Sequence, residues 1–363
     1  MATATMRNST FGEVMAPQQP LVPEKLDELF QSKGDAQKRL LFLHTGGTFG
    51  MSGKDPGLLT PAHYTETVLP YVKGLETLAQ IDVRVVCNID SSDLGPPEWE
   101  QIGRIIFEEH DNFDGFVVLH GTDTMAYTAS ALSFMLQGIR KPVVLTGSQR
   151  PIAHLRTDAR RNLVHATICA TIDVPEVGIY FGDHLFRGNR TTKTSVQSYD
   201  AFTSPNCPPL VSMGVEMFRE AVPALEKRPF RFSPGFDHRV AVVSLAPGIS
   251  PHSLKVMAIE GARAVVIRAF GMGNIPTIGW PDAIHTLCSN GVAVIIVSQC
   301  SQGSVIPGRY EGSTAAAEAG ALFGAELTTE AAVTKSMWLI GQGLSGDSFK
   351  EQFMRPLAGE MNH

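Results

Sequence analysis

The residues of this chain that could do chemistry gather in short segments rich in glycine and hydroxyl side chains. A Gly-Gly-Thr sequence ends at Thr48, a threonine stands beside an acid at Thr122-Asp123, and Lys193 lies among threonines and serines. Glycines let the backbone turn sharply and approach a ligand closely. A lysine near a threonine can accept the hydroxyl proton and so activate the oxygen as a nucleophile. The pattern therefore indicates nucleophilic catalysis.

Each of these features also has a simpler interpretation. Thr122 and Asp123 precede a helical pattern, where either side chain serves as a helix cap. In the functional interpretation, Asp123 binds the ammonium group of a ligand, and the N–H groups at the helix start bind its carboxylate. A lone lysine is commonly a solvated charge, although Lys193 is the only lysine between Lys141 and Lys227. A further glycine turn at residues 146–149 is expected to line the site with backbone amides.

Apolar runs alternate with helix-length patterns from residue 38 onward. The predicted strands are residues 39–44, 83–87, 115–120, 142–147, 177–181, 239–245, 262–270 and 292–299. The predicted helices are residues 99–110, 124–138, 158–170, 251–260, 280–290, 313–323, 328–340 and 345–355. Continuous apolar strands separated by amphipathic helices are typical of a buried, mainly parallel α/β sheet. The candidate residues follow predicted strands, at the edge where such sheets bind ligands.

The chain is long enough for two domains, at 363 residues. Residues 221–238 contain three prolines and no clear period, so we expect a linker there. It would separate a larger N-terminal parallel-sheet α/β domain (38–220), the catalytic one, from a smaller C-terminal α/β domain (239–363). Residues 1–37 are polar, and we expect a mobile extension with at most one short helix.

Composition narrows the class of protein. The net charge of −6 disfavours a nucleic-acid partner, and no apolar run approaches the ~20 residues that span a bilayer. The N-terminal residues lack the apolar region of a secretory signal. Five cysteines, with no C-x-x-C pair, favour a reducing compartment and therefore the cytoplasm. Scattered histidines and the lack of H-E-x-x-H and G-x-S-x-G disfavour a metal site and a serine hydrolase.

The chain resembles the asparaginase/glutaminase family, and its cytosolic bacterial type I branch in particular. Five motifs carry this resemblance, in family order: H-T-G-G-T-F-G (44–50), H-G-T-D-T-M (120–125), T-G-S-Q-R-P (146–151), G-N-R-T-T-K (188–193) and S-Q-C-x-x-G-x-V (298–305). The combination is specific, whereas each motif alone is weak.

The resemblance implies hydrolysis of L-asparagine to L-aspartate and ammonia, without a metal or cofactor. Thr48 matches the nucleophile that forms a β-aspartyl ester. Thr122, Asp123 and Lys193 match a hydroxyl, a carboxylate and a base with roles similar to those of a Ser-His-Asp triad. Backbone amides near Thr122 and in the 146–149 turn would stabilise the oxyanion. Mechanisms within the family differ in which threonine attacks first, and both orders stay open.

Other positions match binding residues of the family. The loop at 88–93 resembles the substrate-carboxylate loop, which would place Asp90, Ser91 and Ser92 in the pocket, although a turn rich in Asp and Ser is common in any protein. Some type I members have a second, effector asparagine site, and four residues match it or lie close to it: Thr192, Arg268, Asn274 and Cys300. Alternatively, the arginine is a strand-end charge and the cysteine a small core residue.

The chain departs from the family pattern at one position. The resemblance also implies that the protein forms an oligomer. Many members carry a tyrosine on a lid shortly after the first motif, where this chain has Leu58. Tyr64 and Tyr310 are candidates to replace it, and our hypothesis is that Tyr310 supports Thr48. The family forms homodimers, often paired into homotetramers, with the site between one subunit's first domain and a neighbour's second domain.

Three other functions fit parts of the same pattern. A glutaminase-leaning enzyme differs by one methylene of substrate, which changes binding by only ~1–3 kcal/mol. A subunit of a tRNA-dependent amidotransferase is disfavoured by the short extension and the acidic charge. A catalytically weak amino-acid-binding sensor is favoured only by the missing lid tyrosine.

Overall fold

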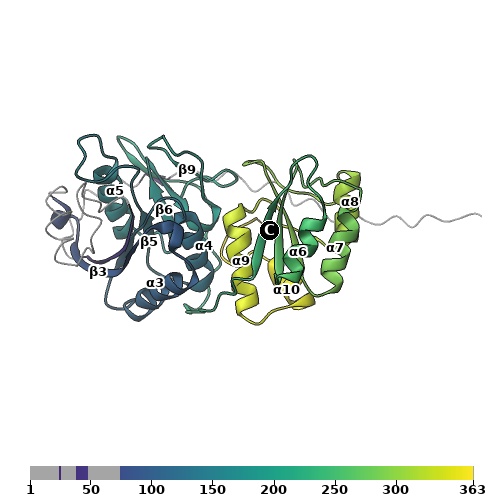
Figure 1. Ribbon diagram of the computed structural model, residues 1–363. Coiled ribbons are helices and arrows are strands. Elements are labelled where there is room, and N and C mark those ends of the chain that lie inside the picture. The colour runs from purple at the N-terminus through teal and green to yellow at the C-terminus, as the bar shows by residue number, and fades with distance from the viewer. Residues whose placement is uncertain (1–23, 26–37, 48–73, 363) are drawn as a thin grey trace, which may run out of the picture.

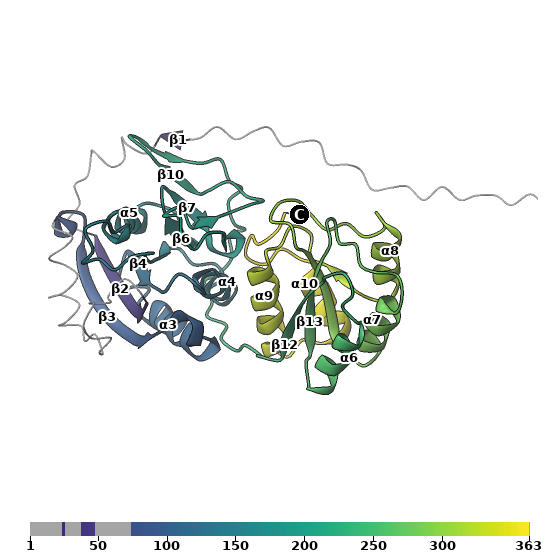
Figure 2. The same cartoon turned by 45° about the horizontal axis from the view of Figure 1, so that its top comes forward.

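The computed structural model describes residues 24–25, 38–47 and 74–362. Two α/β domains lie side by side, and helices α4 (Met125–Met135) and α9 (Thr329–Gly341) face each other between them (Figure 1, Figure 2). The larger domain is N-terminal and holds the sheet that positions the candidate site.

The N-terminal sheet has nine strands among the described residues, in the order β1-β11-β10-β7-β6-β5-β4-β2-β3. The parallel strands are β2 (Arg39–Gly46), β3 (Gln80–Ile89), β4 (Gly115–Leu119), β5 (Val143–Thr146) and β6 (Val177–Phe181). The antiparallel strands are β7 (His184–Arg187), β10 (Val211–Met213), β11 (Met217–Arg219) and β1 (Glu24–Lys25). The prediction of a mainly parallel sheet is confirmed, and the short antiparallel strands were not predicted.

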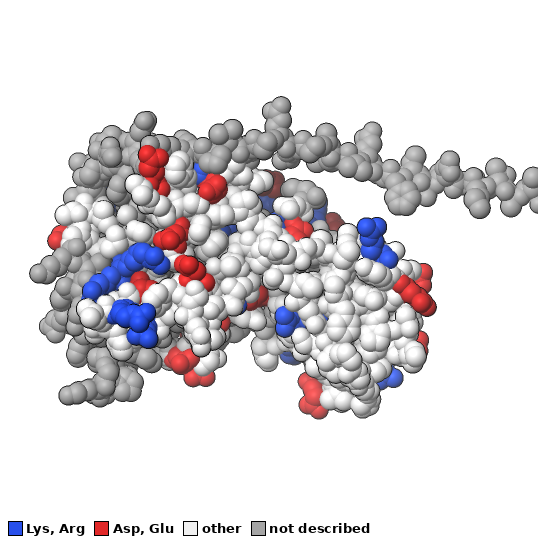
Figure 3. Space-filling view, turned by 90° about the horizontal axis from the view of Figure 1, so that it is seen from above, with Lys and Arg blue, Asp and Glu red and all other residues white. Residues whose placement is uncertain are grey.

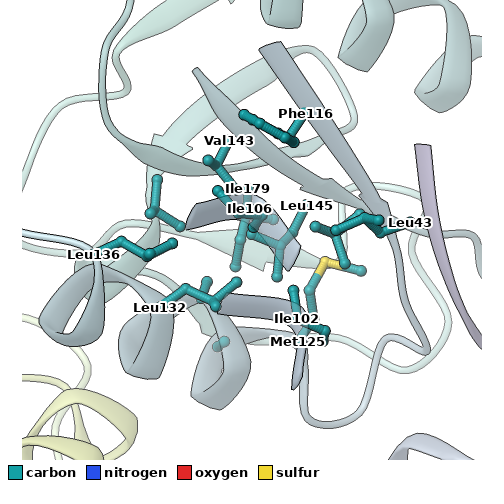
Figure 4. Packing of buried hydrophobic residues seen from close by; sticks show 14 of the residues in the cluster. Leu43, Ile102, Ile106, Phe116, Met125, Leu132, Leu136, Val143, Leu145 and Ile179 are labelled. Carbon is teal, nitrogen blue, oxygen red and sulfur yellow. The ribbon is translucent and has the colours of Figure 1, made fainter. Parts of the chain in front are cut away.

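Alternate residues of the central strands face opposite layers of helix, as the two-residue period of a strand requires. Leu41 and Leu43 of β2 face α3 (Pro96–Glu108) and α4, and Figure 4 shows this packing with Leu43, Ile102, Ile106 and Met125 among its labelled side chains. Leu40 and Phe42 of the same strand face the other side, with α5 (Ala159–Thr171). Burial on both faces explains why these strands are apolar without interruption.

The C-terminal domain is built on a smaller parallel sheet. Its described strands are, in order, β12 (Val240–Ser244), β13 (Ala264–Ala269), β14 (Ala293–Ser298) and β15 (Leu322–Phe323). Its helices are α6 (His252–Ile259), α7 (Trp280–Ser289), α8 (Glu311–Glu318), α9 and α10 (Gly346–Phe353). The predicted helix over 313–323 is wrong beyond Glu318, because Gly320 turns the chain with φ +101° and an apolar pair then joins the sheet edge.

The two domains share a packed interface. Phe134 of α4 lies in the same buried cluster as the apolar face of α9, and its ring stacks on Trp338 with centroids 6.3 Å apart. Arg190, in the 3₁₀ turn η5 (Gly188–Arg190), pairs with Glu326 at 3.0 Å and donates to the carbonyl of Gly359 and to Asn362 Oδ1. The C-terminal segment is thus tied to the part of the N-terminal domain that immediately precedes Lys193.

Residues 220–239 contain no helix or strand, and their aromatic rings Phe230, Phe232 and Phe236 pack against the α3–α4 layer. Of the predicted N-terminal extension, Glu24–Lys25 form β1 against β11, and the predicted short helix lies outside the described residues. On the face in Figure 3, acidic and basic side chains are interspersed over the N-terminal domain.

Candidate active site

The candidate site lies where the order of the parallel sheet reverses. After β2 the chain adds β3 on one side and then crosses to add β4 on the other. Ligands of open α/β sheets bind at such a switch point, outside the carboxyl ends of the strands. Here those ends are the glycines at 46–47 after β2 and the 120–124 loop after β4, which the sequence singled out independently.

Glycines at this point bring three loops into contact. Gly46 and Gly47 have φ of +111° and +83°, a region that favours glycine. A β-carbon on Gly46 would lie 2.3 Å from the carbonyl oxygen of Ile89, and one on Gly121 would lie 2.5 Å from Ser91 Oγ. No larger residue fits without moving the backbone. Thr48, the predicted nucleophile, follows Gly47 in the chain and lies outside the described residues.

Lys193 joins the two polar residues that follow β4. Its Nζ lies 2.8 Å from Thr122 Oγ1 and 2.7 Å from Asp123 Oδ1. Lys193 comes from the short strand β8 (Thr192–Lys193), which pairs with β9 (Phe202–Thr203), and its side chain is only 15% exposed. The Asp123 side chain is 67% exposed and therefore open to a ligand. The structure thus brings together three of the four predicted catalytic residues.

The side chain of Gln149 completes this group. The sequence had predicted no role for that side chain. Thr122 Oγ1 donates to Gln149 Oε1 at 3.3 Å, while Gln149 Nε2 donates to the carbonyls of Ser195 and Ser198. One amide side chain therefore links the loops after β4, β5 and β8. Its presence in the T-G-S-Q-R-P motif was the available signal, but a glutamine in a turn is ordinary and predicts no contact.

Hydrogen bonds to the carboxylate of Asp158 hold the turn at residues 146–149 in place. Asp158 accepts from the backbone N–H of Gln149 at 2.9 Å and of Arg150 at 3.1 Å. Asn162 binds both this carboxylate and the carbonyl of Gly147. The N–H of Gln149 donates to Asp158 and is not available to an oxyanion, while the expectation for the other amides of this turn stays a prediction. Asp158 has a structural role, fixing the loop that carries the Gln149 side chain.

The 88–93 loop packs against the same glycine turn. Ser91 is buried beside Gly121, and its carbonyl accepts from Thr124 Oγ1 at 2.6 Å. Asp90 is exposed and caps the 3₁₀ turn η4 (Ser91–Asp93), accepting from the N–H and hydroxyl of Ser92. These two bonds lower the pKa of Asp90. The loop therefore lies against the 120–124 turn, and the Asp90 carboxylate shapes it, while substrate binding by Asp90, Ser91 and Ser92 stays a prediction.

Two buried histidines stand just before the two glycine turns. Burial lowers the pKa of His44 and of His120 to about 4, so both rings are neutral near pH 7. The Nδ1–H of His120 donates to the carbonyl of Gly121, which leaves Nε2 to accept from Thr128 Oγ1 at 2.8 Å. Each ring fills space beneath a catalytic loop, and His120 also fixes its backbone.

The predicted effector residues lie between the domains and along one edge of the C-terminal sheet. Thr192 Oγ1 donates to Glu330 Oε1 of α9 at 2.6 Å. Arg268, the penultimate residue of strand β13, donates to Ser244 Oγ at 3.2 Å. Asn274 follows β13, and the exposed Cys300 follows β14. Glu330 was not predicted, because nothing in its sequence neighbourhood marks it.

Tyr310 precedes α8, on the side of the C-terminal domain that faces away from the N-terminal domain (Figure 1, Figure 2). Its side chain is exposed. The hypothesis that Tyr310 supports Thr48 stays a prediction, because Thr48 lies outside the described residues. Leu58 and Tyr64 lie outside the described residues.

Comparison with known proteins places these features in a family. The model "Asparaginase, N-terminal" matches residues 39–223, and "Glutaminase/Asparaginase C-terminal domain" matches residues 239–353. The chain belongs to the asparaginase family. Both asparaginase models together cover the switch-point site and the C-terminal sheet.

Relatives of the asparaginase family align along most of this chain. It is 36% identical over 333 residues to "L-asparaginase 1" of Escherichia coli K12, covering 90% of this chain and 98% of the relative. The solved structure of the thermostable L-asparaginase from Thermococcus kodakarensis superposes with a TM-score of 0.83 at 34% identity, covering 90% and 99% of the two chains. The "60 kDa lysophospholipase" of Mus musculus is 37% identical over 357 residues, which cover 63% of that protein.

Within the described ranges, no group of three or more His, Cys, Asp or Glu side chains could hold a metal ion. Among those same residues, no helix is long and apolar enough to cross a bilayer.

Proposed function

We propose that this protein is an L-asparagine amidohydrolase that forms a threonyl acyl-enzyme. The observation that carries the proposal is Lys193, held at 2.8 Å from Thr122 Oγ1 and 2.7 Å from Asp123 Oδ1 at the switch point of the sheet. The family and the relatives named L-asparaginase support it.

In the first half-reaction, Thr48 Oγ attacks the side-chain amide carbon of asparagine. The C–N bond breaks, the nitrogen takes a proton and leaves as ammonia, and a β-aspartyl ester remains. Water then attacks the ester, releasing aspartate and returning the proton to the threonine. Thr122 and Lys193 relay these protons, since the hydroxyl and the amine are already in hydrogen-bond contact. The alternative order, with Thr122 attacking first, uses the same groups.

Asp123 binds the α-ammonium of the substrate, and the Ser91–Ser92 loop binds its α-carboxylate. Before the substrate binds, Lys193 is the only cation among the described residues that pairs with the Asp123 carboxylate. A substrate ammonium would share that carboxylate with Lys193.

The proposal is tested by measuring ammonia release from L-asparagine, L-glutamine and D-asparagine over a concentration series. We expect L-asparagine to give the highest kcat/KM, and Thr48→Ala and Thr122→Ala each to lower kcat by at least ~100-fold. Lysophosphatidylcholine, suggested by the name of the mouse relative, is a fourth test compound, whose hydrolysis is followed by release of fatty acid instead of ammonia. Preference for glutamine would favour the glutaminase alternative, and binding of asparagine without any release would favour the sensor.

A second role is proposed for asparagine as an effector bound by Thr192, Arg268, Asn274 and Cys300. The supporting observation is that Thr192 directly precedes Lys193 and bonds to the other domain through Glu330. A ligand that competes for the Thr192 hydroxyl would therefore act next to the catalytic lysine. Sigmoidal rates that become hyperbolic in Arg268→Ala would support this role, and hyperbolic rates in the unaltered protein would oppose it.

We also propose a cytoplasmic homo-oligomer, a dimer or tetramer. All five cysteines are free thiols, which suits a reducing compartment. The position of Tyr310 favours a site shared between subunits. Light scattering would give the oligomeric state, and loss of turnover in Tyr310→Phe would support a shared site.

A further inference from the structure

The C-terminal domain contacts the catalytic strand through one carboxylate. Glu330 lies in the first turn of α9, whose N-cap is Thr328. Its Oε1 accepts from Thr192 Oγ1 at 2.6 Å. Thr192 and Lys193 form the whole of β8, a two-residue strand that pairs only with β9 in the described structure. So short a strand has little backbone pairing of its own, and the Glu330 bond adds a side-chain constraint to it.

Several features favour a fixed carboxylate at this position. Glu330 is partly buried between α9 and β8, where a charged side chain is retained only with partners. Burial raises the pKa of Glu330, while the Thr192 hydroxyl, Thr328 and the charge of Arg268 oppose that shift. The positive end of the α9 dipole also favours a carboxylate in the first turn. The group is therefore held rather than free to rotate into solvent.

Glu330 also lies close to the helix that carries the other half of the site. Tyr127 stands in the first turn of α4, directly after the Thr122–Thr124 loop. Burial chiefly raises the pKa of Tyr127, and the charge of Glu330 adds to that shift. Tyr127 is partly buried against the apolar cluster that contains Ala331, the residue after Glu330. The first turn of α9 thus packs near the start of α4 and also bonds to the strand bearing Lys193.

We propose that Glu330 is a positioning residue, which holds Thr192 and thereby sets Lys193 Nζ against Thr122 and Asp123. This inference rests on the proposed amidohydrolase function. It also gives the C-terminal domain a role, since that domain would hold the catalytic lysine in position. The carboxylate does not touch the reacting atoms and acts only through the neighbouring residue of the same strand.

The experiment compares Glu330→Ala, Glu330→Gln and Thr192→Val with a control, Asp347→Asn. Asp347 is likewise an acid in the first turn of a C-terminal-domain helix, but its side chain is fully exposed. We expect Glu330→Ala and Thr192→Val each to lower kcat by up to ~100-fold with KM changed less than about threefold, since small misplacements of catalytic groups have such effects. Glu330→Gln, which keeps an oxygen to accept from Thr192, should recover most of kcat.

The double variant Glu330→Ala/Thr192→Val should be no slower than the worse single variant, because both remove one interaction. Multiplicative losses, or a kcat in Glu330→Ala equal to that of Asp347→Asn, would overturn the proposal. Melting temperatures of all variants separate loss of folding from loss of positioning.

A readout without turnover keeps this inference separate from the proposed function. The reaction of Lys193 with an amine-acylating reagent, followed by peptide mass spectrometry, reports how firmly Nζ is held. We expect acylation to be severalfold faster in Glu330→Ala than in Asp347→Asn. If the unaltered protein releases no ammonia and this difference persists, the amidohydrolase function fails and the positioning role stands. Equal acylation rates would reject the positioning role.

Discussion

Gly47 and Gly121 touch through their backbones. A β-carbon built on Gly47 would lie 2.6 Å from Cα and 2.7 Å from N of Gly121. Thr48 and Thr122 each follow one of these two glycines, so this contact joins the loops that carry both candidate nucleophiles. The residues that directly precede the two threonines are therefore in backbone contact.

Gly47→Ala should separate these loops. Its φ of +83° is strained for alanine, at about 1–3 kcal/mol, and the methyl group would also overlap Gly121. We expect asparagine turnover to fall by at least ~100-fold. Gly74→Ala is the matched control, because Gly74 has φ +99° but no atom within 4 Å of an added β-carbon. Equal stability and equal turnover in the two variants would contradict the contact argument.

Asp123→Asn should impair both binding and proton transfer. The change removes the only carboxylate that pairs with Lys193 among the described residues, and it weakens the proposed ammonium site. We expect kcat/KM for L-asparagine to fall by roughly 10²–10⁴-fold, measured by coupled ammonia assay. Asp111→Asn, at a fully exposed acid beside His110, should retain normal turnover. A normal kcat/KM in Asp123→Asn would exclude Asp123 from the site.

Stability should decrease as pH falls from about 7 to 4. In the folded protein the pKa of His120 is about 4, whereas an unfolded histidine titrates near 6.5. Between these values the unfolded state binds more protons, so the unfolding free energy rises with pH. This one ring contributes up to about 3 kcal/mol above pH 6.5.

Urea unfolding at several pH values measures this dependence. His120→Gln should be less stable near pH 7, but its unfolding free energy should vary less between pH 6.5 and 4. His44, whose pKa is lowered to the same extent, should leave part of the slope in place. A slope unchanged by His120→Gln would show that folding does not lower the pKa of this ring.

Lys335 and Glu360 form an ion pair in which both side chains are 0% exposed, with Nζ 2.5 Å from Oε1. Lys335→Met should reduce stability by about 3–5 kcal/mol, because it leaves a buried carboxylate without its cation. Lys350→Met removes the cation of an exposed pair with Asp347 and should change stability by less than about 1 kcal/mol. Thermal or urea unfolding measures the stability of the two variants. Equal losses of unfolding free energy would contradict the argument from burial.

The sequence predicted the long central strands well, because burial on both faces makes them continuous apolar runs. The run at 177–181 coincides with β6. The short strands β7, β10 and β11 have no such signal, since they are three or four residues long and partly exposed. Their pairing depends on tertiary contacts that no local pattern expresses.

The same distinction holds for the site. Thr122, Asp123 and Lys193 were predicted because their types and motifs resemble a family. Gln149 and Glu330 were not predicted, because each contacts a residue far away in the sequence. Thr122 is 27 residues from Gln149, and Thr192 is 138 residues from Glu330. A glutamine or glutamate carries no pattern that identifies a distant partner, and only the folded chain shows the contact.

The ties between Arg190 and the C-terminal segment imply a delay during synthesis. Asn362 follows Arg190 by 172 residues, so at ~5–20 residues per second the ribosome needs roughly 10 to 30 s to supply it. Until then a guanidinium that is 3% exposed in the folded protein lacks its amide partner Asn362, and for the first 136 residues of this interval it also lacks its carboxylate partner Glu326. The N-terminal sheet can therefore collapse well before the turn preceding Lys193 is anchored, and this interval is when we expect the nascent chain to depend most on chaperones.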